Sequence, residues 1–208
     1  MNSLPIIDIS PFLDPHASEE ARLKTARALD SACRTVGFFY LSHTNISVPE
    51  LNEILFLAHE FFSLPSSEKE AIKLLPPGVG DGDGGRGYQC IGDNTTQGKR
   101  DWHEGLDLYR PVLSTKPPYS LVMGMNKWPP GEFRRAYEMY IDKLLVLGEA
   151  VMHAIALGLG EKEDYFDALI NEPFWVMRAI GYPPLESHDD GGISCGEHTG
   201  IVGRYLAY

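Results

Sequence analysis

The segment PFWVMRAIGYPP, residues 173–184, is where the chain changes from helical to extended patterning. It is rich in β-branched and aromatic residues and closes on Pro183-Pro184, which is typical of a strand that meets a turn. The segments before it carry apolar residues mainly at helical spacing. We therefore predict a chain that is helix-rich first, with strands that arrive near its end.

The longest predicted helix lies upstream of this strand and begins at Glu132. Its apolar residues recur on a single face, and Gly158 and Gly160 follow where the pattern stops. A second, short helix is predicted over residues 161–170. The residues of the apolar face are Phe133, Tyr137, Tyr140, Leu144, Val151 and Ile155.

Nearer the start, a short strand at 4–9, a helix, a buried strand at 37–43 and a second helix are predicted in that order. Ser18 is placed to cap the first helix, and two acidic residues follow it in the first turn. Ser47 and Glu50 have the spacing of a capping box at the start of the second helix. That helix carries an apolar stripe that we assign to the core: Leu51, Ile54, Leu55, Ala58, Phe61 and Phe62.

Composition excludes several classes of protein. The 208 residues carry a net charge of −11 and a pI near 5.0, which argues against nucleic acid or an anionic membrane as a partner. Three scattered cysteines favour a reducing, cytoplasmic setting over a disulfide framework. No signal peptide or membrane span is expected. The sequence does not set the oligomeric state.

A glycine-rich segment at 76–87 offers one alternative function. Gly80, Gly82 and Gly85 satisfy the G-x-G-x-x-G pattern of a nucleotide-binding module. Such a loop should follow a strand and open a helix, whereas this one follows two prolines and runs into RGYQ. We therefore predict a flexible surface loop.

Seven segments, taken in order, resemble the iron(II) and 2-oxoglutarate-dependent dioxygenases of the isopenicillin N synthase type, and the plant members most closely. They cover nearly all of residues 4–199: LPIIDIS, ACRTVGFFYLSH, EFFSLPSSEKEAIK, RGYQCIGDNTTQGKRDWHEGLDLYRP, NKWP, PFWVMRAIGYPP and CGEHT. The resemblance implies an α+β fold in three parts. Residues 4–118 are the N-terminal region, 119–171 the long helix and its connector, and 172–208 the start of a truncated double-stranded β-helix, or jelly roll.

The resemblance also implies the site residues. In this family two histidines and one carboxylate hold iron(II), and open positions remain for 2-oxoglutarate and O2. His198 matches the first metal ligand, Gly200 stands where the aspartate belongs, and neither the second histidine nor the R-x-S of the family follows. Tyr182 matches a position close to 2-oxoglutarate. Arg86 and Tyr88 match a segment that borders the substrate pocket, where an arginine can pair with a substrate carboxylate.

Two other groups of metal-ligating residue types are present. His188 and Asp190 also fit H-x-D, but they lie in a polar stretch that we predict to be a solvated loop. His103, Glu104 and Asp107 offer three ligand types close together without a second histidine. We predict that this group is structural.

The functional prediction is an iron(II)/2-oxoglutarate-dependent dioxygenase family member that oxidises, by hydroxylation, a small organic molecule. Fe(II) and 2-oxoglutarate are the cofactors that the resemblance implies. We expect this chain to be catalytically incomplete, because a single imidazole does not hold iron(II) against water. The alternative is an inactive truncated isoform or fragment with at most a binding role.

Overall fold

The computed structural model describes residues 3–96, 98–113 and 115–184, which divide into two compact units. Unit 1 contains the described residues up to Leu51 together with Glu138–Pro173. Unit 2 contains the described residues of Asn52–Tyr137 and those from Phe174 onwards. The long helix α5 (Phe133–Gly158) therefore contributes its first residues to unit 2 and the rest to unit 1. Helices and small sheets coexist in the chain, which confirms the predicted α+β class.

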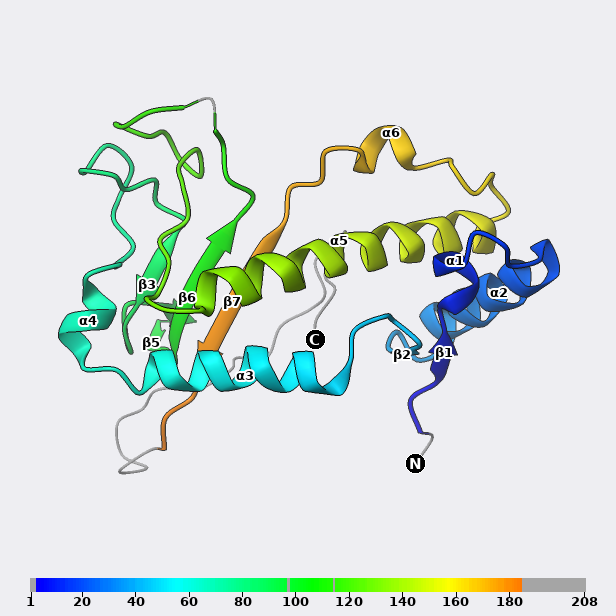
Figure 1. Cartoon of the computed structure of the whole chain (residues 1–208), viewed down its shortest axis with the longest axis horizontal. Coiled ribbons are helices and arrows are strands. Elements are labelled where there is room, and N and C mark those ends of the chain that lie inside the picture. Colours follow the sequence, from blue (N-terminus) through cyan, green and yellow to red (C-terminus); the bar gives the residue numbers. More distant parts are fainter. Residues whose placement is uncertain (1–2, 97, 114, 185–208) are drawn as a thin grey trace. The chain divides into compact units, whose positions relative to one another are not determined.

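Unit 1 is built on helices α2 (Glu19–Thr35) and α5, whose apolar faces meet strand β1 (Ile6–Asp8) (Figure 1). Strand β2 (Tyr40–Ser42) pairs with β1 in parallel. Short helices α1 (Ser10–Leu13) and α6 (Asp167–Ile170) complete the unit. Its buried core consists of Ile7, Ile9, Leu29, Ala32, Leu147, Ala150, Val151 and Ala154.

The predicted helix ends in unit 1 are confirmed, and two other predictions need correction. The Ser18 hydroxyl accepts a hydrogen bond from the backbone N–H of Ala21, so it caps α2 as expected. The predicted strand at 37–43 is shorter than expected, and its Tyr40 is exposed. Side chains alternate along a strand, so Leu41 packs on the core while Tyr40 points to the opposite face. The short helix predicted over 161–170 is limited to α6.

Unit 2 holds a three-stranded antiparallel sheet in the order β3-β6-β7. Figure 1 shows β7, drawn in orange, beside β6, drawn in green, although the two strands are far apart in the sequence. Its elements are the part of α3 (Val48–Phe62) from Asn52 onwards, α4 (Ser66–Glu70), β3 (Gly87–Gln89), β4 (Thr95–Thr96), β5 (Lys99–Arg100), β6 (Glu104–Tyr109) and β7 (Val176–Gly181).

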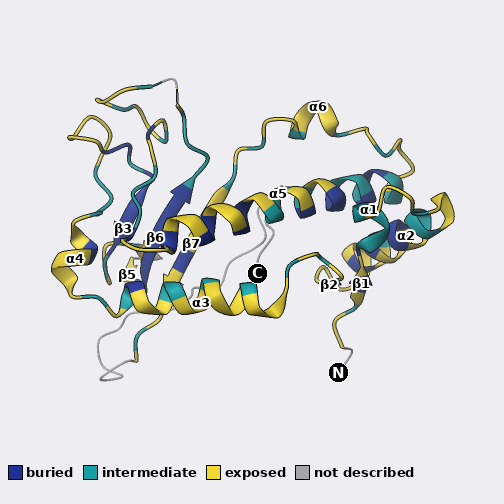
Figure 2. Cartoon of the chain, in the orientation of Figure 1, coloured by how far each residue is buried: buried dark blue, intermediate teal, exposed yellow. Residues whose placement is uncertain are grey.

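Strands in unit 2 come earlier in the chain than predicted. β3 and β6 precede α5, and both are almost wholly buried (Figure 2). The glycine-rich segment 76–87 is a loop that runs into β3 rather than a helix. Residues 76–81 are exposed, as predicted for a surface loop, but the remainder is not a surface loop. Gly82, Asp83 and Arg86 are buried within it.

The prediction that the apolar stripe of α3 is buried is only partly correct. Phe61 is buried and Ile54 packs against the core, as predicted. Leu51 and Leu55 are exposed, Leu55 to 68%. Apolar residues cover more than one face of this helix, Leu57 and Phe56 included, so periodicity alone did not decide which face packs inward.

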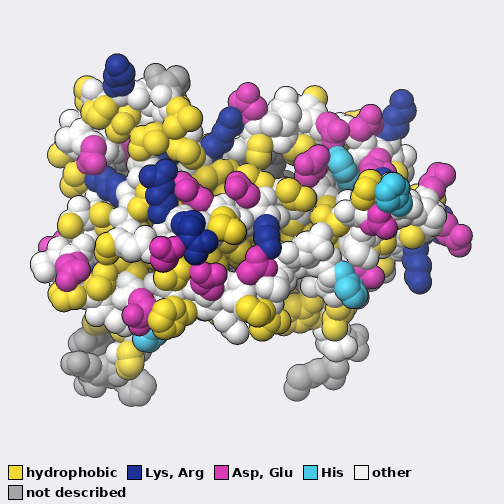
Figure 3. Space-filling view, viewed as in Figure 1, with side chains coloured by type: hydrophobic (Ala, Val, Ile, Leu, Met, Phe, Trp, Pro, Cys, Tyr) yellow, Lys and Arg dark blue, Asp and Glu magenta, His cyan; other side chains and the backbone are white. Residues whose placement is uncertain are grey.

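The surface offers little that identifies a partner. The face drawn in Figure 3 carries acidic and basic side chains intermixed with apolar ones. Within the described ranges, no helix has both the length and the apolar character that a membrane crossing requires.

The capping box at the start of α3 predicts a pH-dependent stability. Lys143 of α5 and the N–H and hydroxyl of Ser47 all donate to Glu50, and these hydrogen bonds lower the pKa of its carboxyl from 4.5 to about 2. The lowered pKa means that the contacts stabilise the fold above about pH 4.5, and that this contribution is lost as the pH falls toward 2. Glu50→Gln should therefore lower the urea midpoint near neutral pH, and the difference from the unaltered protein should shrink on acidification. A constant difference at every pH would contradict this assignment.

Candidate active site

The sheet β3-β6-β7 has one apolar and one polar face, because side chains alternate along each strand. On the apolar face, Leu106 and Leu108 of β6 are buried with Ala179 of β7 in the core of unit 2. On the polar face, Asp107 of β6 lies directly opposite Arg178 of β7.

A buried carboxylate organises the polar face. Asp107 is almost fully buried and accepts hydrogen bonds from Nε and Nη2 of Arg178. The side-chain amide of Gln89 in β3 donates a third hydrogen bond to Oδ2 of Asp107, at 2.7 Å. The hydrogen bonds to Asp107 raise the pKa of Arg178 despite its partial burial. Three side chains from three strands therefore form one fixed group around a charged pair.

Aromatic residues flank this group at both ends of the strands. Tyr109, at the end of β6, lies near Phe174, with ring centroids 5.8 Å apart. At the other end, the rings of His103 and Tyr182 lie 5.7 Å apart and tilted. Tyr182 is 54% exposed, while Nδ1 of His103 is buried and has no hydrogen-bond partner within the described ranges. The predicted co-substrate residue thus stands at the edge of the polar face.

Arg86, predicted to bind substrate, is only 1% exposed and lies in the glycine-rich loop. Its guanidinium donates to the Asp83 carboxylate, to Oδ1 of Asn126 at 3.1 Å and to the backbone carbonyl of Arg110. Burial alone would raise the pKa of Asp83, but hydrogen bonds from the backbone N–H groups of Gly85, Arg86 and Gly124 and from the Arg86 guanidinium outweigh it, and the pKa is lowered. Arg86 is therefore engaged in holding the loop, and its substrate role stays a prediction.

Tyr88, the second predicted substrate residue, lies on the apolar face of the sheet. Its hydroxyl donates to Oε2 of Glu104 at 2.6 Å, and Nζ of Lys69 donates to the same oxygen at 2.7 Å. Burial, followed by the hydrogen bond to Glu104, raises the pKa of Tyr88. Tyr88 reaches the neighbourhood of Tyr182 only through Glu104, which lies opposite Gly181, and its substrate role also stays untested.

The described residues do not by themselves provide an iron site. His198, like His188 and Asp190, lies outside them. In the part of the chain that is described, no three His, Cys, Asp or Glu side chains gather in a way that could hold a metal. Glu104 and Asp107 point to opposite faces of β6. A single metal ion could therefore not contact both of them together with His103.

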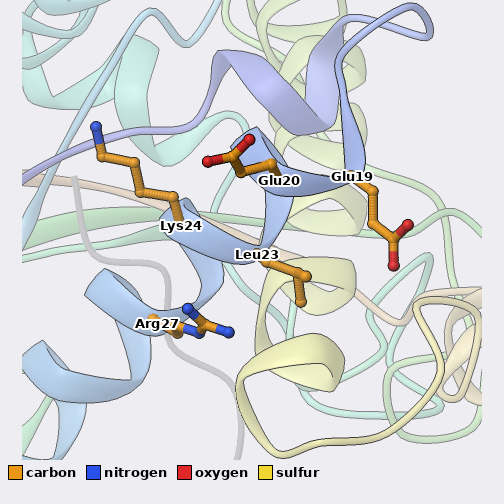
Figure 4. A pocket seen from close by; sticks show the side chains of 5 residues that line it. All are labelled: Glu19, Glu20, Leu23, Lys24 and Arg27. Carbon is orange, nitrogen blue, oxygen red and sulfur yellow. The ribbon is translucent and has the colours of Figure 1, made fainter.

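A surface hollow elsewhere lacks the features of an active site. Its volume is about 510 Å³, and all five of its lining side chains project from α2 (Figure 4). Four of them are exposed charged groups around a half-buried leucine, without a converging polar group. The lining residues are Glu19, Glu20, Leu23, Lys24 and Arg27.

Asp107 was predicted only as part of a structural group with His103 and Glu104, and neither Arg178 nor the pairing of the two was predicted. Each is a single charge in the middle of an apolar strand, in GLDLY and VMRAI. A charge at such a position costs free energy unless it is paired, so two of them in one chain indicate a cross-strand partner. That signal was present in the sequence.

The chain is similar to known proteins over most of its length. A family model described as the N-terminal region of non-haem dioxygenase in morphine synthesis matches residues 4–131. A homoarginine-6-hydroxylase of Arabidopsis thaliana is 40% identical over 94% of this chain, and one of Oryza sativa subsp. japonica is 39% identical over 95%. The chain spans 56% and 62% of the length of these two relatives.

Among solved structures, that of a full-length Neurospora crassa protein in complex with α-KG and thymine matches 94% of this chain. The TM-score is 0.74 and the sequence identity 26%. The match covers 61% of that protein. The arrangement of helices and small sheets is thus that of a 2-oxoglutarate and iron(II) oxygenase.

Proposed function

The chain belongs to the family of non-haem dioxygenases that use iron(II) and 2-oxoglutarate, and on that premise we propose that it serves the hydroxylation of a small organic molecule. The observation that carries the proposal is the polar face of β3-β6-β7. It places a fixed charged pair, Asp107 and Arg178, on the sheet whose strand β7 leads directly into Tyr182, in a chain that superposes on a protein bound to α-KG and thymine.

The roles of individual residues follow from this proposal. Tyr182 contacts the co-substrate, and His198 supplies an imidazole ligand to iron(II). When bound, iron(II) and 2-oxoglutarate supply the oxidising chemistry. The chain's own contribution is to bind and orient the substrate on the polar face and to exclude water from the apolar face beneath it.

The plant relatives favour a particular kind of substrate. Proteins of Arabidopsis thaliana, Oryza sativa and Glycine max that share 38–40% identity with this chain are named homoarginine-6-hydroxylases. A guanidino amino acid, or a molecule similar in size and charge, is therefore the first substrate to test.

A chimera tests the proposal. Residues 1–199 of this chain would be joined to the remaining C-terminal part of the Arabidopsis relative, which supplies the aspartate of H-x-D. With iron(II) and O2, it should consume 2-oxoglutarate faster when homoarginine is added. The matched control carries glycine in place of that aspartate, as this chain does at Gly200. It should lose turnover by about 100-fold or more, since metal sites depend on each converging ligand.

Two results would count against the proposal. A well-folded chimera that consumes no 2-oxoglutarate, while the Arabidopsis relative does so in parallel, would show that this N-terminal part does not support the reaction. Equal turnover by the aspartate and glycine chimeras would show that position 200 does not supply a metal ligand, and this would remove the H-x-D match on which the assignment of His198 rests.

A further inference from the structure

We propose that Arg178 binds a carboxylate of the substrate and that Asp107 is the residue that positions it. The proposal deepens the function above and rests on it, because it names the chemical class that the polar face recognises: a small organic acid or amino acid. The sequence predicted this role for neither residue, since Asp107 was expected to be structural and Arg178 was not named.

The hydrogen bonds of Arg178 leave one edge of its guanidinium open. Nε and Nη2 donate to the two carboxylate oxygens of Asp107, which uses one of the two bidentate edges. Nη1 donates no hydrogen bond to another described residue, although the charge of Asp101 also acts on the guanidinium, and the arginine side chain is 43% exposed. A guanidinium has five N–H donors in a rigid plane, so the edge formed by Nη1 and Nη2 can donate hydrogen bonds to a second carboxylate in the same plane.

Asp107 fixes the direction of that open edge. Its own side chain is 2% exposed and is held from the other side by the amide of Gln89. A buried carboxylate with three hydrogen bonds does not rotate freely, so the plane of the guanidinium is set before a ligand arrives. Pre-organisation of this kind reduces the entropy lost on binding.

The register of the strands leaves room for the rest of the ligand. Next to Arg178 on the polar face, Gly105 of β6 stands opposite Ile180 of β7, and Gln89 lies on its other side. Gly105 presents no side chain, and Ile180 is partly exposed. A molecule whose carboxylate sits on Arg178 can lay its carbon chain over this surface toward Tyr182, where we place the co-substrate.

Direct binding to the full chain tests the inference without any turnover. Homoarginine and its neutral carboxamide differ only in the group that Arg178 would recognise, and hexanoate carries the carboxylate alone. Calorimetry should show homoarginine binding about 10- to 100-fold more tightly than the carboxamide, as expected for a charge-assisted bidentate contact. Homoarginine and hexanoate should both shift the Nε–H resonance of Arg178.

Four variants separate recognition from folding. Arg178→Gln should abolish the preference for the carboxylate, and Arg178→Lys should restore part of it. Asp107→Asn should reduce the preference about tenfold while the arginine remains, because the guanidinium edge is no longer fixed. Arg34→Gln is the matched control: Arg34 is also an arginine paired with an aspartate through Nε, but on the exposed side of α2, and its loss should change nothing.

Equal affinity for homoarginine and its carboxamide would overturn the inference, as would the absence of any shift with either carboxylate. A full preference in Arg178→Gln would do the same. The chimera distinguishes this failure from failure of the proposed function. If it hydroxylates substrate unchanged with Arg178→Gln, the function stands and this inference falls; if it is inactive although Arg178 binds carboxylates, the reverse holds.

Discussion

Replacing Arg86 with methionine should lower the free energy of unfolding by about 3–5 kcal/mol, the cost of leaving a buried charge without its partner. The charge in question is that of Asp83, which is 2% exposed in the same loop. The guanidinium of Arg86 also donates to Asn126 and to the carbonyl of Arg110, so three acceptors each lose one hydrogen bond at once. Urea unfolding of the variant and the unaltered protein measures the difference.

Two further variants show where the cost arises. Adding Asp83→Asn to Arg86→Met removes the carboxylate charge that has lost its arginine. The double variant should recover part of the lost free energy of unfolding, which gives a clear coupling in a double-mutant cycle. Arg34→Met removes an exposed arginine that is paired with Asp30, and it should leave the urea midpoint almost unchanged, because water screens an exposed ion pair.

The outcome decides between two roles for Arg86. If Arg86→Met leaves stability unchanged and weakens substrate binding, the segment borders the substrate pocket, as the family resemblance implies. If it destabilises the fold as expected, the arginine is needed to hold the glycine-rich loop against Arg110 and Asn126. Arg86→Lys should then fail to rescue, because an ammonium group lacks the planar fork that reaches several acceptors.

The same loop shows how far the sequence predicts the fold. Local signals predicted the helices well: the caps at Ser18 and at Ser47 with Glu50 are confirmed, and the long helix begins and ends within a residue or two of its predicted ends. These signals depend on residues three or four apart. The burial of Asp83 and Arg86 depends on Asn126 and Gly124, some forty residues away, and no local pattern contains that information.

Strand β6 was missed for a related reason. Its sequence, EGLDLY, alternates apolar and polar residues over too short a stretch to stand out, and its partner β7 comes after the long helix. A strand becomes stable only when its partner arrives, so a pairing between distant segments is the least predictable part of a fold. The polar face was missed with it, because Asp107 and Arg178 meet only through this pairing. Tyr182 could be named in advance because its segment resembles a known family.

The second large effect concerns Lys69, whose ammonium group is buried on the apolar side of the sheet. Lys69→Met should cost about 3–5 kcal/mol in urea unfolding, since Glu104 would then keep its buried charge with Tyr88 as its remaining side-chain partner. Lys73→Met is the matched control: Lys73 lies four residues further on, and its side chain is 43% exposed near Asp93. Its loss should cost at most about 1 kcal/mol.

This network also bears on the candidate site. Glu104 is paired with Gly181 across β6 and β7, and a Cβ atom at Gly181 would come within 3.3 Å of Cγ of Glu104 and 2.9 Å of the Phe62 ring. Glu104 therefore packs against the residue that precedes Tyr182. A change that lets Glu104 move should also displace Tyr182, which tyrosine NMR or near-ultraviolet circular dichroism can detect.

The double variant Lys69→Met with Glu104→Gln identifies the cause of the loss. It removes both charges and leaves an amide that still accepts the hydrogen bond from Tyr88. If the cost of Lys69→Met comes from the Glu104 carboxylate left without its lysine, the double variant should be more stable than the single one. The Tyr182 signal should then return toward that of the unaltered protein. If the double variant is as unstable as the single one, the cost comes from lost contacts of the lysine stem or from its hydrogen bond to the carbonyl of Phe62. In that case the ion pair does not hold this end of the sheet, and the link from Lys69 to Tyr182 is wrong.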